Sequence, residues 1–298
     1  RDTQNLYAIA SRTAARAAKV AQEYRAAFPA LRAYTREELL MDPAVEVVYV
    51  CSPNACHFED VKLCLEAGKH VLCEKPFTVT CEQAETLIAL ARARGLFLME
   101  GMWMAHLPLL RRMRRMIEQG VLGDVQYVKA DYGFISGGMR LKRKLSRALG
   151  GGALMDVGVY TLAFPYLCFG EAPFACLSRA VYGQEGTDER SFSILQYTRA
   201  RYAAISSAIG VVIPPRGMVC GTKANLFFPD FEAAQSMELQ RHGGDTKVFT
   251  EPFLSTGLEY EISETADCIR QGLLQSGVWS WNDTLSLQRQ LAMLRAQW

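Results

Sequence analysis

The sequence predicts an α/β protein with two domains. Residues 1–105 are expected to form a doubly wound parallel sheet, and residues 106–298 an α+β domain with a large, mainly antiparallel sheet. The chain has 298 residues, half of them hydrophobic, which is enough for two cores. In the first part, short apolar runs alternate with helical stretches. Later runs alternate polar and apolar residues or are rich in β-branched and aromatic residues, which is typical of antiparallel strands.

In the first domain, strands and helices follow each other in turn. Apolar runs bounded by turn residues predict strands at residues 6–10, 30–34, 45–51, 70–73 and 96–100. Alanine-rich or amphipathic stretches predict helices at residues 11–27, 55–67 and 81–94, and a helix at residues 107–119 opens the second domain. A further short helix begins after Thr35, which forms a capping box with Glu38. Gly68, Gly95 and Gly120 are placed to end helices.

In the second domain, the pattern changes after Asp124. Strands are predicted at residues 125–132, 175–182, 191–197, 200–209, 218–221 and 224–228. Closing helices are predicted at residues 257–271 and 283–298. The basic stretch 140–147 (RLKRKLSR) is expected to be an exposed loop.

Composition excludes several classes of function. The net charge of +2, without an extensive basic run, argues against nucleic acid as a partner. The four histidines have no metal-ligand spacing, so no metal is expected. No uninterrupted apolar run is long enough for a membrane span. Nine scattered cysteines without a C-x-x-C pair indicate reduced thiols and a cytoplasmic protein.

The stretch 71–77 (VLCEKPF) ends an apolar strand with a charged pair and a proline. In open α/β sheets, ligands bind beyond the carboxyl ends of the strands, so Glu74 and Lys75 lie where such a fold places its chemistry. A lysine at this place can be partly desolvated, which lowers its pKa and suits it to proton handling. The alternative is a surface ion pair at a strand end.

Two other stretches belong with this one. The strand 45–51 (VEVVYVC) ends in Ser52, Pro53 and Asn54, and residues 150–160 read GGGALMDVGVY. Together with Glu-Lys-Pro, these motifs resemble the Gfo/Idh/MocA family of glucose–fructose oxidoreductase and inositol dehydrogenase, nearest to the dihydrodiol and xylose dehydrogenases. The resemblance extends from about Leu6 to the C-terminus. It implies a Rossmann-type domain that binds a nicotinamide cofactor.

The resemblance assigns cofactor contacts to the strand ends. Ser52, Pro53, Asn54 and His57 match the turn that lines the nicotinamide, although His57 fits a packing role equally well. Glu74, Lys75 and Pro76 match the second turn, in which the Lys-Pro bond of family members is often cis.

Ser11 and Arg12 stand where an acidic residue would bind the ribose 2′-hydroxyl of NAD. An arginine there accommodates a 2′-phosphate, so NADP(H) is expected. The alternative is a helix N-cap at Ser11 with a solvated Arg12. The expected first strand with its G-x-G-x-x-G turn does not occur before Leu6, which suggests a fragment that lacks about thirty residues, roughly one β-α unit. The C-terminus is expected to be clipped as well, because it lacks the short extended tail of many relatives.

Asp156 and Tyr160 are spaced so that both lie on one face if the segment is helical. The resemblance places Tyr160 as general acid/base and Asp156 as the residue that orients the substrate or Lys75. The Lys75 ammonium is expected to lower the tyrosine pKa from its usual value of about 10. The alternative is a helix N-terminal acid and a half-buried tyrosine.

The segment 101–108 (GMWMAHLP) departs from the family pattern, because Met104, Ala105 and His106 replace an expected arginine region. Trp103 matches a residue that lines the site, although a core tryptophan is as good an interpretation. The expected function is NAD(P)-dependent hydride transfer on a sugar, polyol or cyclic diol. The alternative is a non-catalytic cofactor-binding or sensor relative. A homodimer or homotetramer is expected from the resemblance alone.

Overall fold

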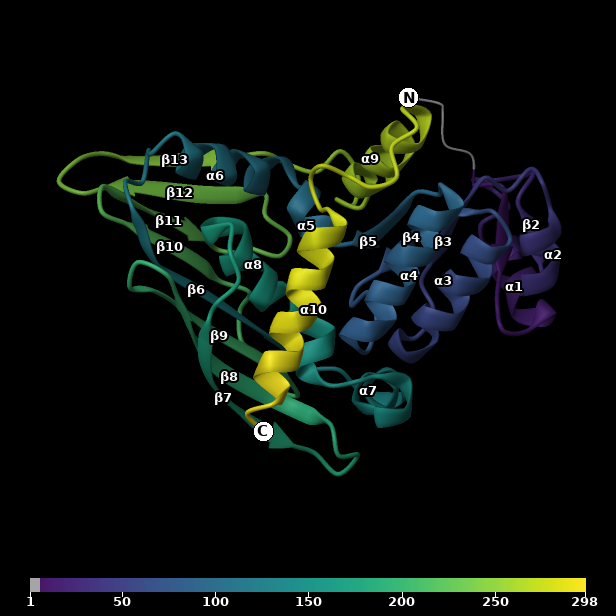
Figure 1. Cartoon of the computed structure of the whole chain (residues 1–298), viewed down its shortest axis with the longest axis horizontal. Helices are drawn as coiled ribbons and strands as arrows, with labels where there is room; N and C mark the ends of the chain where they lie inside the picture. Colours follow the sequence, from purple (N-terminus) through teal and green to yellow (C-terminus); the bar gives the residue numbers. More distant parts are fainter. Residues whose placement is uncertain (1–5) are drawn as a thin grey trace.

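The computed structural model describes residues 6–298, with the backbone alone at position 140. Figure 1 shows two bodies side by side. The first, coloured purple to blue, contains short parallel strands with helices around them, and the second, teal to green, is built on one large sheet. The helix α10 (Trp281–Arg295) lies between them.

The parallel strands of the first body form two separate small sheets. β1 (Ala8–Ala10) pairs with β2 (Arg32–Tyr34), while β3 (Val47–Val50) pairs with β4 (His70–Glu74), and β4 with β5 (Leu98–Gly101). Within residues 6–298, β1 and β3 share no ladder of hydrogen bonds. In the strand order of a dinucleotide-binding fold, another strand lies between these two positions. The two small sheets are therefore separated at the position of that strand.

Helices of the first body begin and end close to the predicted residues. They are α1 (Ala14–Glu23), α2 (Arg36–Met41), a 3₁₀ turn (Asn54–Cys56), α3 (His57–Glu66) and α4 (Cys81–Arg94). The capping box of Thr35 with Glu38 and the left-handed Gly95 at the end of α4 are confirmed. The cap of α1 is Thr13, whose hydroxyl accepts a hydrogen bond from the Arg16 amide at 3.3 Å, so the alternative of an N-cap at Ser11 is wrong.

The second body contains, in the described part of the chain, an eight-stranded sheet in the order β13-β12-β11-β10-β6-β9-β8-β7. Its strands are β6 (Val125–Phe134), β7 (Ala175–Tyr182), β8 (Asp188–Tyr197), β9 (Arg201–Ile209), β10 (Gly217–Gly221), β11 (Ala224–Phe228), β12 (Ser236–Arg241) and β13 (Thr246–Thr250). β6 pairs with β9 in parallel, and the other neighbours are antiparallel, which confirms a mainly antiparallel sheet. The hairpin of β12 and β13 was not anticipated.

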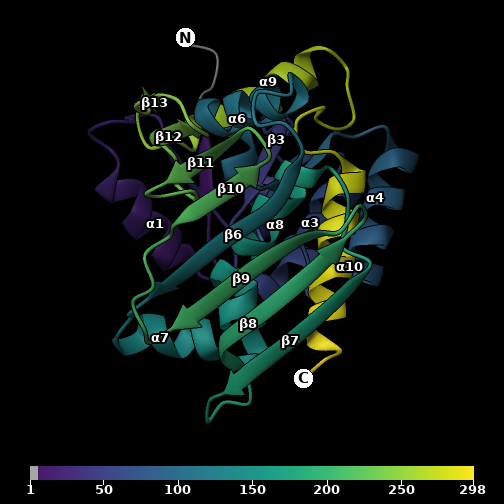
Figure 2. The ribbon, with the colours of Figure 1, turned by 90° about the vertical axis from the view of Figure 1, so that its left-hand side faces the viewer.

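The helix α8 (Val159–Phe169) lies against one side of this sheet (Figures 1 and 2). Every residue of α8 is buried, and Phe164 packs against Phe228 and Phe231 with ring centroids 5.5 and 4.9 Å away. Contrary to the expectation from the sequence, the helical stretch Arg147–Phe169 is long and apolar enough for a membrane span. However, 89% of its most apolar window is buried inside the protein, so it serves as a core helix.

Three further helices lie between β5 and α8 in the chain. They are α5 (Trp103–His106), α6 (Pro108–Glu118) and α7 (Gly138–Leu145). The expectation of a loop at 140–147 is wrong, because α7 and a 3₁₀ turn (Arg147–Leu149) occupy it. The basic residues belong to a short amphipathic helix, one face of which packs against the rest of the protein.

The C-terminal helices bind the two bodies together. α9 (Glu259–Arg270) and α10 pack on the first body as well as the second. The buried carboxylate of Glu100, at the end of β5, accepts hydrogen bonds from the Phe77 amide, the Trp279 indole and the Thr284 hydroxyl at 2.9–3.0 Å. The boundary between residues 105 and 106 stays a prediction, since later helices complete the core of the first body.

Candidate active site

Lys75 reaches from the end of β4 into the second body. Its ammonium donates to the main-chain carbonyl of Asp156 at 2.6 Å and lies 3.6 Å from the Asp156 carboxylate. The same nitrogen lies 4.4 Å from the centre of the Tyr160 ring. The peptide bond between Lys75 and Pro76 is cis, as the resemblance implied. The structure therefore brings together the three residues that were expected to carry the chemistry.

The turn before α8 places Asp156 and Tyr160. Gly152 has a φ of +126°, and a Cβ there would lie 2.2 Å from the Asp188 carboxylate. Asp188, on β8, accepts the Leu154 amide at 2.6 Å and so satisfies a free amide at the start of the helical segment. Burial raises the pKa of Asp188 to about 6 although these amides oppose the shift. The chain then passes through a π-helical turn (Leu154–Gly158), a feature that often occurs at functional sites.

The environment of Tyr160 corrects one expectation. Burial, and then the carboxylates of Glu232 and Glu74, raise the pKa of Tyr160 well above its usual value. Lys75 lies over the face of the ring and makes no hydrogen bond to the hydroxyl. Tyr160 is therefore a neutral phenol at physiological pH, and its hydroxyl makes no hydrogen bond within residues 6–298.

Asp156 binds two lysines. Besides Lys75, its carboxylate pairs with Lys144 of α7, whose ammonium also lies 4.6 Å from the centre of the Phe134 ring. Sequence reasoning missed Lys144, because it assigned this segment to a loop. The only signal was the run of basic residues nine to sixteen positions before Asp156.

Glu74 supports the neighbouring turn. Its carboxylate accepts the Lys75 amide at 3.1 Å and the Tyr49 hydroxyl at 2.5 Å. These contacts hold the backbone of Lys75 at the strand end. Val47 and Tyr49 are exposed on one face of β3.

The turn after β3 lies beside the same cluster. Asn54 donates to the Gly150 carbonyl at 2.9 Å, and a small cavity of about 50 Å³ joins Pro53 and Asn54 to Lys144 and Asp156. The Ser52 hydroxyl is buried and has no hydrogen-bond partner in the described chain. The predicted nicotinamide turn is therefore adjacent to Asp156.

His57 is corrected to a positioning residue. Its ring is fully buried, and its two nitrogens lie 2.9 Å from the Pro76 carbonyl and 2.8 Å from the Ser52 carbonyl. No surface of the ring is left for direct contact with a cofactor. Instead, the imidazole links the turns that follow β3 and β4.

Trp103 lies at the edge of the site with a carboxylate that the sequence did not reveal. Its indole nitrogen donates to Glu232 at 3.1 Å, and its ring packs edge-on against Phe253 at 5.9 Å. The unusual neighbours Met104, Ala105 and His106 are buried. Burial lowers the pKa of His106 to about 3, so this histidine is a neutral core residue.

The expected adenosine contacts lie on the other side of the first body. Ser11 and Arg12 follow β1, and the Arg12 side chain is exposed. Within residues 6–298, no group of three or more His, Cys, Asp or Glu residues is arranged to hold a metal ion.

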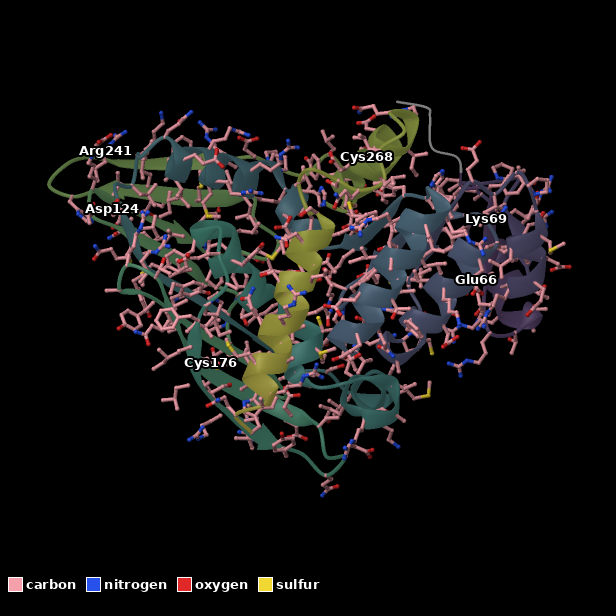
Figure 3. The ribbon with its side chains drawn as sticks, viewed as in Figure 1. Glu66, Lys69, Asp124, Cys176, Arg241 and Cys268 are labelled. Carbon is pink, nitrogen blue, oxygen red and sulfur yellow. The ribbon has the colours of Figure 1, made fainter. Side chains whose placement is uncertain are left out.

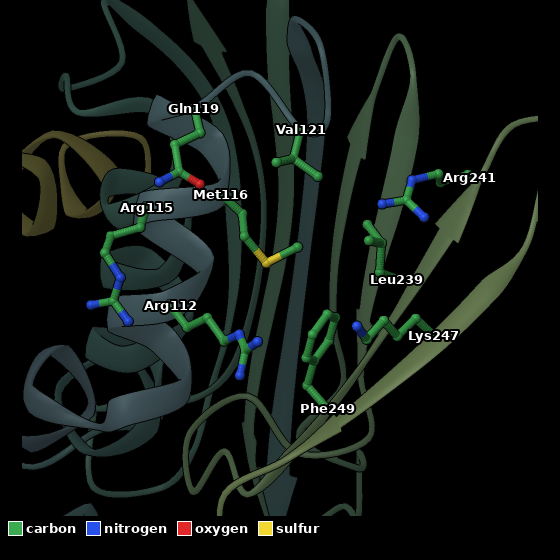
Figure 4. Close-up of a pocket in the computed structure, with 9 residues that line it drawn as sticks. All are labelled: Arg112, Arg115, Met116, Gln119, Val121, Leu239, Arg241, Lys247 and Phe249. Atoms are coloured by element: carbon green, nitrogen blue, oxygen red, sulfur yellow. The ribbon is translucent and has the colours of Figure 1, made fainter.

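A second groove, of about 390 Å³, lies between α6 and the β12–β13 hairpin (Figure 4). Arg112, Arg241 and Lys247 line it around Phe249, and no acidic residue does. Its lining residues do not include Lys75, Asp156 or Tyr160. The cluster around Lys75 is therefore the candidate active site.

Known proteins match the chain over nearly all of its length. Residues 1–102 match the model of the Gfo/Idh/MocA oxidoreductase family with an NAD-binding Rossmann fold, and residues 110–227 match the Gfo/Idh/MocA C-terminal domain. Trans-1,2-dihydrobenzene-1,2-diol dehydrogenase from Xenopus laevis is 35% identical over 83% of this chain and 77% of its own length. The enzyme of that name from Homo sapiens is 32% identical over 93% of this chain and 84% of its own.

Solved structures of other oxidoreductases have the same fold as this chain. The aldose–aldose oxidoreductase from Caulobacter crescentus has a TM-score of 0.86 and 26% identity over 98% of this chain and 89% of its own. The 3-ketoreductase KijD10 from Actinomadura kijaniata, solved with NADP and TDP-benzene, has a TM-score of 0.87 and 25% identity over 100% of this chain and 90% of its own. With the motifs, the fold and these relatives in agreement, the chain belongs to the Gfo/Idh/MocA family of oxidoreductases.

Proposed function

We propose that this protein is an NADP(H)-dependent dehydrogenase or reductase that transfers a hydride between the nicotinamide and a secondary alcohol or carbonyl of a sugar, polyol or cyclic diol. The meeting of Lys75, Asp156 and Tyr160 at the end of β4 carries this proposal. The relatives support it, since they include a dihydrodiol dehydrogenase, an aldose–aldose oxidoreductase and a 3-ketoreductase.

The residues at the strand ends fit a dinucleotide. The buried Ser52 hydroxyl lacks a partner within residues 6–298 and suits a polar group of a ligand. Ser11 does not cap α1, and the exposed Arg12 suits a 2′-phosphate. We therefore assign Ser11 and Arg12 to the adenosine end, and the turns at Ser52–Asn54 and Glu74–Pro76 to the nicotinamide end.

The chain's own residues position the substrate and move its proton. When bound, the cofactor supplies or accepts the hydride. Lys75, fixed by Asp156, holds the substrate oxygen with a remaining N–H. Tyr160 donates its proton to that oxygen during reduction, because its raised pKa keeps the hydroxyl protonated. Oxidation requires the phenolate and should therefore become faster as the pH rises.

Cofactor choice is tested by titrating the protein with NADPH and NADH while nicotinamide fluorescence is recorded. We expect tighter binding of NADPH, and the Arg12→Ala variant should reduce this preference. A preference for NADH would contradict the assignment of Arg12. If neither nucleotide binds to the folded protein, the non-catalytic alternative replaces the enzyme.

Catalysis is tested with the variants Lys75→Ala and Tyr160→Phe on a panel of sugar, polyol and diol substrates. Each should lower kcat by roughly 10²–10⁴-fold, the usual contribution of a positioned proton donor or acceptor. The Kd for NADPH of Tyr160→Phe should stay unchanged. Lys223→Ala, in an exposed turn of the second body, is the control. Full activity of both active-site variants would refute the assignment.

We further propose a homodimer formed through the outer face of β7–β9. Leu177, Phe192 and Ile194 are each more than half exposed on this face, and Leu177 lies directly opposite Ile194 in the register of β7 and β8. Figure 2 shows that no helix covers these strands on the side turned to the viewer. A contiguous apolar patch of this kind marks an interaction surface.

A cytoplasmic location remains part of the proposal. All nine cysteines, which lie within the described residues, are unpaired. Figure 3 shows two of them, Cys176 and Cys268, in distant parts of the molecule. Free thiols of this number suit a reducing compartment.

A further inference from the structure

The loop between β11 and β12 holds Glu232 in a fixed place. The Asp230 carboxylate accepts the amides of Glu232 and Ala233 at 3.1 and 2.9 Å, which closes the turn. Phe231 is fully buried against Phe164 of α8, with ring centroids 4.9 Å apart. The backbone at Glu232 is thus anchored on both sides.

The Glu232 side chain is held in place by Trp103. One carboxylate oxygen accepts the indole N–H at 3.1 Å. The indole is itself held in place, because its ring packs against Phe253 on one side. It also packs so closely on Gly257 that a Cβ at this glycine would lie 2.5 Å from the ring. The other Glu232 oxygen has no hydrogen bond within residues 6–298, and the side chain is partly accessible. This oxygen is a free acceptor beside the indole.

The charged groups that interact with Glu232 connect it to the candidate active site. Burial, and then Asp230 of the same loop, raise the pKa of Glu232 to about 7, while Lys75 and the Trp103 N–H oppose the shift. Asp156 adds a smaller upward effect. Glu232 in turn raises the pKa of Tyr160 and Tyr132. Glu232 therefore belongs to the same electrostatic site as Lys75 and Tyr160.

We propose that Glu232 is a specificity-determining residue that accepts a hydrogen bond from a second hydroxyl of the substrate, away from the reacting carbon. The Trp103 indole provides an apolar wall beside this acceptor, and a sugar ring or cyclic diol presents both kinds of surface. A substrate with only the reacting group would leave a half-buried carboxylate without a partner, which sites of this kind reject strongly. This inference rests on the proposed function and adds a requirement for a hydroxyl beyond the reacting group.

The experiment compares two ketones that differ by one hydroxyl, 2-hydroxycyclohexanone and cyclohexanone. The protein should prefer the hydroxyketone in kcat/KM, and Glu232→Leu should reduce that preference by about tenfold or more, as expected for one charge-assisted hydrogen bond. Glu238→Gln, on β12, is the matched control.

The preference should also depend on pH. Below about pH 7 the Glu232 carboxyl is protonated and accepts weakly, and above it the carboxylate accepts strongly, so the preference should rise with pH. Glu232→Gln should show no such rise. Equal preference at all pH values in the parent protein would overturn the inference.

A second readout does not need turnover. The indole ¹H–¹⁵N resonance of Trp103, identified with Trp103→Phe, should titrate with a midpoint near 7 and lose this titration in Glu232→Gln. Addition of 2-hydroxycyclohexanone should shift it in the parent protein but not in Glu232→Leu. If both ketones are reduced in a Lys75-dependent manner with the same preference in Glu232→Leu, the inference fails while the proposed function stands. If neither ketone is reduced, the proposed function fails for these two substrates. The role of Glu232 is then judged by the Trp103 indole shift alone, and no shift on addition of 2-hydroxycyclohexanone would overturn it.

Discussion

Glu261 is a buried carboxyl without hydrogen bonds. It is fully buried in α9, and neither of its oxygens has a partner within residues 6–298. Burial, and then the neighbouring Glu74 and Glu100, raise its pKa to about 8. An ionised carboxylate at this position would be unsatisfied, so the neutral acid is the stable form near pH 7.

This makes stability depend on pH. In the unfolded chain Glu261 titrates at about 4.3. Because the pKa of Glu261 is higher in the folded protein, its contribution to the free energy of unfolding is complete below the unfolded pKa. This contribution is lost as the pH rises towards the folded pKa of about 8. Glu261→Gln should remove this loss, so the variant should gain a few kcal/mol relative to the parent between pH 5 and pH 8, since one pKa unit corresponds to about 1.4 kcal/mol.

Urea unfolding at the two pH values measures this change in free energy. The exposed Glu118→Gln is the control and should follow the parent protein. An identical pH dependence for parent and Glu261→Gln would show that Glu261 ionises normally.

Among single residues, the sequence predicted which side chains form the site better than it predicted their protonation. Lys75, Asp156 and Tyr160 meet as expected, because strand ends and a glycine-rich turn have local signatures. The pKa of Tyr160 could not be predicted, since it depends on burial and on Glu232, 72 positions later in the chain. Glu232 carries no motif, and only tertiary packing brings it to Trp103.

The segment before α8 depends on glycine. Gly152 combines a left-handed φ with close approach to Asp188, so any side chain there meets both strain and a clash. Its displacement would move Asp156 and Tyr160 away from Lys75. The geometry of the site therefore depends on the glycine that begins the helical segment containing Asp156 and Tyr160.

Gly152→Ala should lower the free energy of unfolding by about 1–3 kcal/mol or more and abolish most activity. Gly170→Ala is the matched control at the other end of α8. It also has a left-handed φ but no neighbour within 4 Å of its Cβ, so it should cost only about 1–2 kcal/mol and keep activity. Denaturant unfolding and a kcat measurement on both variants test this. Equal activity of the two variants would contradict the role given to Gly152.

Element prediction succeeded where the apolar pattern was strong. Parallel strands such as β4, and helices with caps such as α4, were predicted to within a few residues. The β12–β13 hairpin was missed although Met237 and Leu239 are buried and alternate with polar residues, because each of its two strands is only five or six residues long. α7 was missed because a basic surface on a short helix resembles a basic loop.

For the whole molecule, the outer face of the sheet predicts association. Ile194→Lys places a charge in the centre of the apolar patch on β7–β9 and should convert a dimer to a monomer without unfolding it. Light scattering after size-exclusion chromatography measures the mass. Val248→Lys, at an exposed apolar position on β13, is the control and should remain dimeric. A monomeric parent protein would refute the proposed dimer.

The position of α9 and α10 has a consequence for synthesis on the ribosome. Trp281 belongs to the core of the first body, and Cys268 covers the buried faces of Leu72 and Met99. A nascent chain must therefore carry the face of β4 and β5 that holds Leu72 and Met99 uncovered until α9 has emerged, about 160 residues after β5. The first body completes its folding only after α9 and the start of α10 have emerged, and until then this uncovered apolar surface is open to non-native contacts.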